Sequence, residues 1–427
     1  MAVQQKKRDL IALASIPLIM TLGNSMLIPI LPSLRKELQV SSLQVSLIIT
    51  VYSVVAILLI PLAGFLSDRV GRKKVIIPCL AITGAGGLIA GLAPLWSDHT
   101  YGWILGGRVL QGIGAAGSAP VVIPLVGDMF KKESDVSAGL GLIETANTFG
   151  KVLSPILGSL LAVLAWYLPF LAIPVISAIS LLMVAVLVRV PRRQEQPETL
   201  RQFFSEVKAV FNEKGRWLYA IFAVGGICMF LVFSFLFFLS QILEDRYNVH
   251  GAAKGGLLAI PTAALCLCSF TAGKWIGENK RRMKWLNFAG AAVAAAAMFI
   301  CGFFRIDSVF MLFILIAIGG AGIGAALPCL DAMVTEGIDK KQRGTVTSIF
   351  SSIRFIGVAA GPPASSVLLE YSQRSLFFVM AAVGTASALL ALIAIRPHSS
   401  EPNPGEIVQR FQPKQKNRRN RRLRTKA

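Results

Sequence analysis

The chain has 427 residues, of which 54% are hydrophobic and 15% charged, whereas soluble domains carry roughly 25% charged residues. That apolar surplus excludes an ordinary water-soluble fold and favours the lipid bilayer as the solvent. The formal net charge is +21, but the basic residues lie between apolar segments and in one tail. This placement indicates membrane topology and no nucleic-acid partner.

Twelve apolar segments follow one another, each long enough to cross a hydrocarbon core of about 30 Å. They span residues 10–32, 43–65, 75–95, 103–126, 139–163, 169–189, 216–242, 254–276, 286–304, 308–330, 346–370 and 375–395. The first one follows Lys6, Lys7 and Arg8, as a signal peptide would. It is too long for a signal peptide and ends in a proline-containing stretch, so it is predicted to be the first span.

The distribution of positive charge predicts the orientation. Of the 43 Lys and Arg residues, 34 fall on one side if the chain begins there. Six fall on the other side, namely Arg35, Lys36, Arg246, Lys254, Arg305 and Arg374, and three fall within spans, namely Arg108, Lys151 and Arg354. By the positive-inside rule, both termini are expected in the cytoplasm and the chain is expected to be a multi-pass cell-membrane protein.

The longest polar interruption divides the chain in two. We expect an N-terminal bundle at 1–189, a cytoplasmic linker at 190–215, a C-terminal bundle at 216–396 and a disordered basic cytoplasmic tail at 397–427. The predicted fold class is all-α integral membrane, with twelve transmembrane helices in two six-helix, pseudo-symmetric bundles.

An internal repeat supports the two halves. Gly-Ile-Gly-Ala-Ala begins at Gly112 and again at Gly322, and Ser154-Pro155 corresponds to Gly361-Pro362. A glycine followed by two basic residues also occurs in both halves, at an offset near 208 residues. Several matches in order indicate a duplication, the architecture of rocking-bundle transporters with a central site.

The connection between the second and third segments reads GFLSDRVGRKK at 64–74. Gly64 permits close helix approach and Gly71 a tight turn. Asp68 can pair with Arg69 or Arg72, or can cap the N-terminus of a neighbouring helix. A loop that only satisfies the positive-inside rule would not need this ordered set of glycines and charged residues, which also includes Lys73.

This stretch resembles the loop signature of the major facilitator superfamily, and three further stretches resemble its twelve-helix drug:proton antiporter family. These are Leu22-Gly23 with Pro29 and Pro32; Arg108 with Gln111, Gly112 and Gly114; and Gly141, Gly150, Ser154-Pro155 and Gly158-Ser159. The family motif has glycine where this chain has Ser154 and Ser159. Serine is nearly as small, so close packing is expected to survive.

The resemblance implies proton-driven export of small amphipathic compounds. It implies that Asp68 and its basic neighbours help to stabilise the outward-facing state. It also assigns proton coupling to Arg108 and export direction to the glycine and proline residues of the fifth helix.

Ionisable residues at membrane depth are costly and therefore indicate function. Glu144, Asn147 and Lys151 share one helix face, and Arg354 matches Asn147 in the repeat. We expect these polar faces to line a central cavity together with Asn24 and Gln111. The alternative is a structural Glu144–Lys151 pair, but seven residues separate the two by about 10 Å. Glu144 is the carboxylate clearly within a span, and is the predicted proton site.

Three cations against one deep carboxylate predict a cavity that favours an anionic or catechol-like substrate, such as a siderophore of the bacillibactin class. Asn24 and Ser25 stand where some relatives carry acidic residues for cationic drugs. Aromatic residues crowd 230–238 and line either a hydrophobic pocket or the core.

Two other functions compete with proton-coupled export. One is uptake of a metabolite by symport; the other is a membrane sensor or enzyme. The sequence has no nucleotide-binding loop or metalloprotease motif, so no enzymatic activity and no cofactor are expected. All six cysteines lie in apolar segments without ligand-spaced histidines, so no metal site is expected either. The expected partners are a small-molecule substrate, protons and the lipid bilayer, with the chain acting as a monomer.

Overall fold

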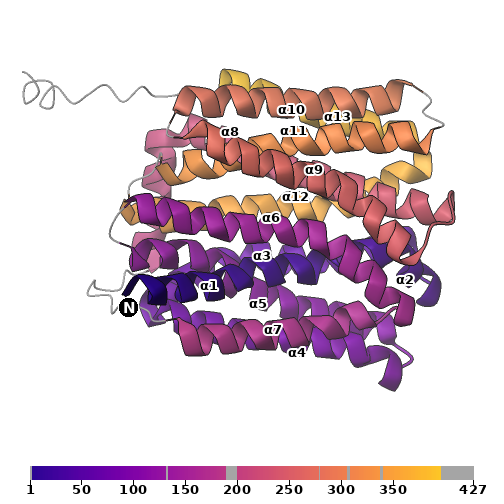
Figure 1. The fold of residues 1–427 in the computed structure, drawn as a ribbon, viewed down its shortest axis with the longest axis horizontal. Coiled ribbons are helices and arrows are strands. Elements are labelled where there is room, and N and C mark those ends of the chain that lie inside the picture. Colours follow the sequence, from indigo (N-terminus) through magenta and orange to yellow (C-terminus); the bar gives the residue numbers. More distant parts are fainter. Residues whose placement is uncertain are drawn as a thin grey trace, which may run out of the picture.

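The computed structural model describes residues 2–130, 133–188, 200–277, 279–304, 308–336 and 340–395. Within these residues, twelve helical segments are long and apolar enough to cross a membrane, and each overlaps one of the predicted segments. They run side by side along one long axis of the molecule (Figure 1). Residues 189–199 and the predicted tail at 397–427 lie outside the described residues.

The first half contains α1 (Ala2–Ser25), η1 (Ile28–Ile30), α2 (Leu31–Glu37), α3 (Ser42–Val70), α4 (Arg72–Trp96), α5 (Thr100–Met129), α6 (Glu133–Leu164) and α7 (Leu168–Leu187). The second half contains α8 (Leu200–Asp245), α9 (Gly251–Ile276), α10 (Lys280–Phe303), α11 (Val309–Glu336), α12 (Lys340–Tyr371) and α13 (Gln373–Ile393). The predicted linker at 190–215 is therefore helical from Leu200 onward. Its apolar residues Leu200, Phe204, Val207 and Phe211 recur at the spacing of an amphipathic helix.

The first span is a broken helix, not the single helix predicted at 10–32. The α-helix ends at Ser25, a short 3-10 turn follows at Ile28–Ile30, and α2 completes the crossing. Pro29 and Pro32 lack the backbone N–H that a continuous helix needs, which explains the break. Broken helices are common at the central sites of transporters.

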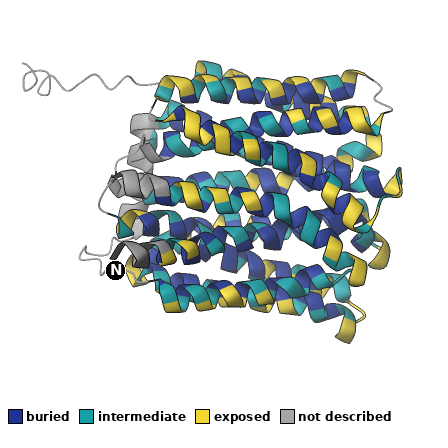
Figure 2. Ribbon diagram, in the orientation of Figure 1, coloured by how far each residue is buried: buried dark blue, intermediate teal, exposed yellow. Residues whose placement is uncertain are grey.

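The helices form two bundles that lie side by side. Helices α1 to α7 fill the lower part of Figure 1 and α8 to α13 the upper part. The bundles meet mainly along α3 with α12 and along α6 with α9. Exposed positions recur along peripheral helices such as α7 and α10 (Figure 2). The spans at 8–37 and 215–245 have the largest share of buried residues. A site shared by both bundles therefore lies next to α1 and α8.

Glycines lie at equivalent helix contacts in both halves. Gly114 on α5 packs against Cys79 and Thr83 of α4, and Gly322 on α11 packs against Gly290 of α10. The helix pairs α4–α5 and α10–α11 thus both meet through glycines, which agrees with a duplication.

The two ends of the bundle are called the terminal end and the distal end. The terminal end carries the start of α1, the α3–α4 turn at Gly71 and the end of α13. The distal end carries α2 and the α8–α9 connection at 246–250 (Figure 1).

Candidate functional site

A void lies between the two bundles near the middle of the spans. Its lining residues come from the broken first span, α6, α8 and α9, namely Ser25, Ile28, Pro29, Lys151, Pro155, Val232, Phe233, Leu236 and Leu258. Lys151 is the charged residue of this lining, and its Nζ is buried without a hydrogen-bond partner in the described part of the chain. Of the crowded aromatic residues, Phe233 lines the void, whereas Phe235, Phe237 and Phe238 are buried in the core. The void thus combines apolar walls with one cation that has no hydrogen-bond partner there, and its volume of about 10 Å³ leaves room for about one water molecule.

Lys151 belongs to a cluster of four charged residues from both bundles. Glu144 lies two turns away on α6, and Asp331 on α11 and Arg354 on α12 lie within range of electrostatic interaction with Lys151. Arg354 Nη1 donates to Asp331 Oδ1 at 3.1 Å. The members of this cluster thus come from opposite bundles, on α6, α11 and α12.

The charge balance of this cluster differs from the prediction. Two cations face two carboxylates, because Arg108 lies apart within the first bundle and Asp331 lies within reach of Lys151. The predicted span ended at residue 330, but α11 continues to Glu336, which places Asp331 more than a turn inside the helix. Asp331 is absent from the site residues predicted from the sequence. The excess of cations on which the prediction of an anionic substrate rests is therefore not found among these four residues.

Asn147 connects this cluster to the first span. Its Nδ2 donates to the Glu144 carboxylate at 3.2 and 3.3 Å, and its Oδ1 accepts from Thr21 Oγ1 on α1 at 2.5 Å. Thr148 Oγ1 also lies 3.5 Å from Glu144 Oε1. Within the described part of the chain, Glu144 is therefore held by uncharged hydrogen-bond donors and makes no direct hydrogen bond to Lys151.

Arg108 is fully buried within the first bundle, apart from the void. Its Nε donates to the carbonyl oxygen of Ile48 at 2.8 Å and its Nη1 to that of Gly23 at 3.2 Å. Its two terminal nitrogens also donate to the side-chain oxygens of Gln111 and Asn24. Asn24 and Gln111, predicted to line the cavity, thus surround Arg108 and are absent from the lining of the void.

The loop between the second and third spans forms a charged junction at the terminal end. Arg72 Nη2 lies 3.0 Å from Asp68 Oδ1, and its Nε lies 2.5 Å from Asp128 Oδ2 on α5. Lys73 Nζ donates to the carbonyl oxygens of Ala185 and Val188 at the end of α7, at 2.7 and 2.8 Å. The loop thereby ties α3 and α4 to α5 and α7.

Two glycines of this loop have distinct roles. Gly71 has φ of +112°, a conformation that side chains disfavour. A Cβ at Gly64 would lie 3.1 Å from Ser348 Oγ on α12, so α3 approaches the second bundle closely there. Arg69 is exposed. Of the predicted partners of Asp68, Arg72 lies in direct contact with it.

Replacing Arg72 by glutamine is expected to lower thermal stability. The side chain is buried, but its carboxylate partners are about a third or more exposed, so screening limits the loss to about 1 kcal/mol. For a chain of this size we expect a fall in Tm of about 2 °C, measured by intrinsic fluorescence in detergent. Arg69→Gln, at an exposed position of the same segment, is the matched control and should leave Tm unchanged. An equal fall in both variants would contradict a specific role of the Arg72 pairs.

The motif of the fifth span packs α6 against the first span. Gly158 lies against the backbone of Met26, and a Cβ at Gly150 would lie 3.2 Å from the carbonyl oxygen of Leu18. Pro155 is buried and lines the void. Gly141 is exposed, with no neighbouring atom near its Cβ position in the described residues, so it contributes no close approach there. Ser154 and Ser159 are buried, and Ser154 Oγ donates to the carbonyl oxygen of Gly150 at 2.6 Å.

Two pseudo-symmetric helical bundles around a shared, partly charged void are the architecture of membrane transporters with a central site. The Major Facilitator Superfamily model matches residues 13–306 and 238–425. The chain belongs to this superfamily.

Known relatives and solved structures agree with this membership. The chain is 51% identical over 395 residues to the bacillibactin exporter of Bacillus subtilis strain 168, covering 92% of this chain and 98% of that one. It is 26% identical to the class C tetracycline resistance protein of Escherichia coli, covering 88% and 93% of the two chains. The crystal structure of the human organic anion transporter MFSD10 has a TM-score of 0.72, at 19% identity and 90% and 99% coverage. The last likeness shows the fold.

Proposed function

We propose that this protein exports a small organic molecule from the cytoplasm in exchange for protons, by alternating access. The observation that carries the proposal is the buried Lys151 ammonium, which has no partner among the described residues, in a void between two bundles. A buried cation without a partner is costly, so its retention favours a ligand that supplies the missing acceptor. Export is supported by relatives named as exporters and resistance proteins.

The proposed substrate is an anionic or catechol-like siderophore, of the kind named for the relative from Bacillus subtilis. Ionised oxygens would accept hydrogen bonds from Lys151, and the apolar side chains of Ile28, Phe233 and Leu258 would contact aromatic surface. Arg354 lies in the same cluster, but Asp331 already neutralises it in this state.

The charge distribution supports an orientation with the terminal end in the cytoplasm. We take residues 1–189 and 216–396 as the two moving bodies, joined by the cytoplasmic segment at 190–215. The tail at 397–427 is assigned to the same side. The protein acts as a monomer, because the site lies between two halves of one chain.

Transport in inside-out membrane vesicles tests this function. Vesicles that contain the protein should accumulate bacillibactin when a pH gradient, acid inside, is imposed, and should lose this activity when the gradient is collapsed. Metabolite profiles of the culture medium from a deletion strain identify the natural substrate. Accumulation in right-side-out vesicles instead would establish uptake and contradict export.

Replacing Glu144 by glutamine is expected to uncouple export from the proton gradient. The new amide can keep a hydrogen bond with Asn147 but cannot take up a proton. We expect gradient-driven accumulation to fall to the level without a gradient, while exchange of labelled for unlabelled bacillibactin continues. Glu370→Gln, at an exposed position on α12, is the control and should behave like the parent protein. Accumulation that persists in Glu144→Gln would remove Glu144 from this role.

A further inference from the structure

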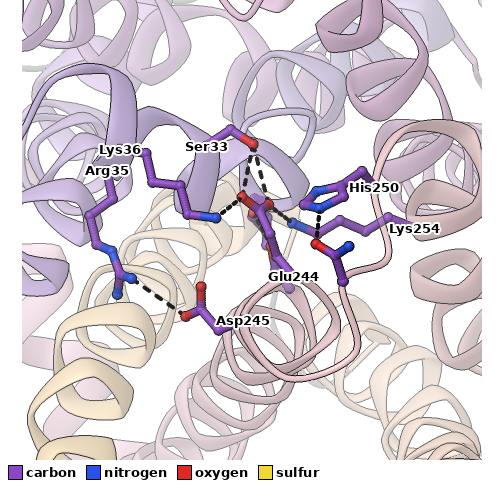
Figure 3. Close-up of polar contacts among 10 residues, drawn as sticks. Ser33, Arg35, Lys36, Glu244, Asp245, His250 and Lys254 are labelled. Carbon is purple, nitrogen blue, oxygen red and sulfur yellow. Dashed lines mark hydrogen bonds and ion pairs between the residues drawn. The ribbon is translucent and has the colours of Figure 1, made fainter.

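A second set of charged residues joins the two bundles at the distal end (Figure 3). Glu244 at the end of α8 accepts from Lys36 Nζ at 3.2 Å and from Ser33 Oγ at 3.2 and 3.3 Å, both on α2. Arg35 Nη2 of α2 lies 3.5 Å from Asp245 Oδ2. Two consecutive carboxylates of the second bundle thus hold one short helix of the first bundle. We name Ser33, Arg35, Lys36, Glu244, Asp245 and Lys254 the distal cluster.

Burial within the distal cluster is uneven. The side chains of Glu244 and Lys254 are each 3% exposed, whereas those of Lys36 and Arg35 are 54% and 31% exposed. A buried carboxylate needs partners, but exposed cations reach water easily. The contacts of α2 to Glu244 can therefore break at low cost, provided that Glu244 keeps another partner.

Lys254 supplies that partner from the bundle to which Glu244 belongs. Its Nζ donates to Glu244 Oε2 at 2.8 Å, from the first turn of α9. When the bundles separate, this pair moves as one unit and Glu244 is not left unpaired. Lys254 is thus a positioning residue, while Ser33 and Lys36 are the contacts that form and break.

Further contacts between the bundles lie between the distal cluster and the void. Ser240 Oγ on α8 donates to the carbonyl oxygen of Ile28 at 2.8 Å, and a Cβ at Gly255 would lie 2.6 Å from the carbonyl oxygen of Pro155. Ile28 and Pro155 line the central void. The void is therefore covered by successive contacts between the bundles on its distal side.

The broken first span connects the void to the distal cluster. Ile28 and Pro29 line the void, and Ser33 and Lys36 follow within eight residues on α2. A ligand that displaces the turn at Ile28–Ile30 would move α2 directly. The break gives α2 the freedom to move without the whole of α1.

We propose that the distal cluster is a gate that holds the extracellular side closed, in which Ser33 and Lys36 release Glu244 when the transporter opens outward and Lys254 keeps Glu244 in place. The proposal rests on the orientation stated under the proposed function. It adds the residues that control release of the substrate.

Accessibility of a thiol in the void tests the gate without any substrate. Leu236→Cys, in a chain whose six native cysteines are alanine, places a thiol on the void wall below the gate. Labelling of intact cells with a membrane-impermeant maleimide is expected to accelerate about tenfold on adding Glu244→Gln, and less on adding Lys36→Met, because Ser33 still holds the carboxylate. Glu37→Gln, the same chemical change at an exposed position of α2, is the matched control and should have no effect. Unchanged labelling in Glu244→Gln, at parental amounts in the membrane, would overturn the proposal.

A covalent cross-link that holds the gate closed provides the second test. Ser33→Cys with Glu244→Cys, bridged in cells by a short bifunctional thiol reagent, is expected to abolish bacillibactin accumulation in vesicles prepared from those cells. Reduction of a cleavable bridge should restore it in the same molecules, which excludes misfolding. Transport that persists in bridged protein would overturn the gate. Absence of bacillibactin transport in the parent protein would contradict the proposed substrate only, and the labelling experiment would still decide on the gate.

Discussion

Replacing Lys151 by methionine is expected to reduce bacillibactin export about 50-fold, because a charge-assisted hydrogen bond contributes roughly 1.5–3 kcal/mol to binding. Methionine has a similar shape and fits the apolar wall of the void. The ammonium has no hydrogen-bond partner in the described residues, so its removal breaks no hydrogen bond there. We therefore expect the loss of transport to occur without a fall in Tm, a combination that a structural lysine would not produce.

Two variants make this experiment specific. Lys151→Arg keeps the charge and should retain measurable binding, with altered affinity because the guanidinium is larger and planar. Lys274→Met removes a lysine at an exposed position of α9 and should leave both export and Tm unchanged. Isothermal binding measurements with purified protein separate loss of binding from loss of turnover. Unchanged affinity in Lys151→Met would remove Lys151 from the substrate site.

The architecture could be predicted because a bilayer constrains it strongly. Apolar segments long enough to cross a membrane have few alternatives to a helix, since every backbone polar group must be paired within the segment. The exact ends were less predictable. Charged stretches such as 200–214 continue α8 beyond the hydrocarbon core, where hydropathy gives no signal. The same extension of α11 brought Asp331 into the site.

Individual charged residues could be recognised as functional, but their partners could not. Lys151 and Arg354 were identified by their depth in the membrane alone. The pairing of Arg354 with Asp331, and of Glu244 with Lys36 from the other bundle, depends on the packing of helices far apart in the sequence. Periodicity within one helix carries no information on such pairs. The sequence places Lys36 and Lys254 only among the basic residues of one side and carries no prediction for Glu244, although the three belong to the gate proposed above.

The break in the first span illustrates a different limit. Pro29 and Pro32 were noticed as part of a family motif, and their lack of N–H donors favours a break. A proline can also be accommodated by a kink within a continuous transmembrane helix. The structure selects the break, which places Ser25 and Ile28 at the void and frees α2 to carry the distal contacts.

Arg108→Lys is expected to abolish proton-driven export, with a reduction of about 100-fold or more. The guanidinium donates in four directions, to two carbonyl oxygens and to the side chains of Asn24 and Gln111, and its carbon lies 4.4 Å from the centre of the Tyr52 ring. A lysine ammonium has three donors without the planar fork, so at least one buried acceptor loses its partner. The cost of such a loss is about 1–3 kcal/mol, which should also lower Tm.

The distinction between structural damage and lost coupling comes from two comparisons. Tyr52→Phe keeps the ring beneath the guanidinium and should transport like the parent protein, whereas Tyr52→Leu removes the ring and should weaken export in part. Asn24→Ala deletes a single acceptor and should reduce stability less than Arg108→Lys. If Arg108→Lys retains bacillibactin exchange while losing accumulation against a gradient, Arg108 acts in proton coupling. Loss of exchange and accumulation together, with Tm lowered, would restrict Arg108 to holding α1, α3 and α5 in place. These helices carry the acceptor groups that converge on one guanidinium. Under either result, Arg108 is the residue through which the three helices of the first bundle are joined.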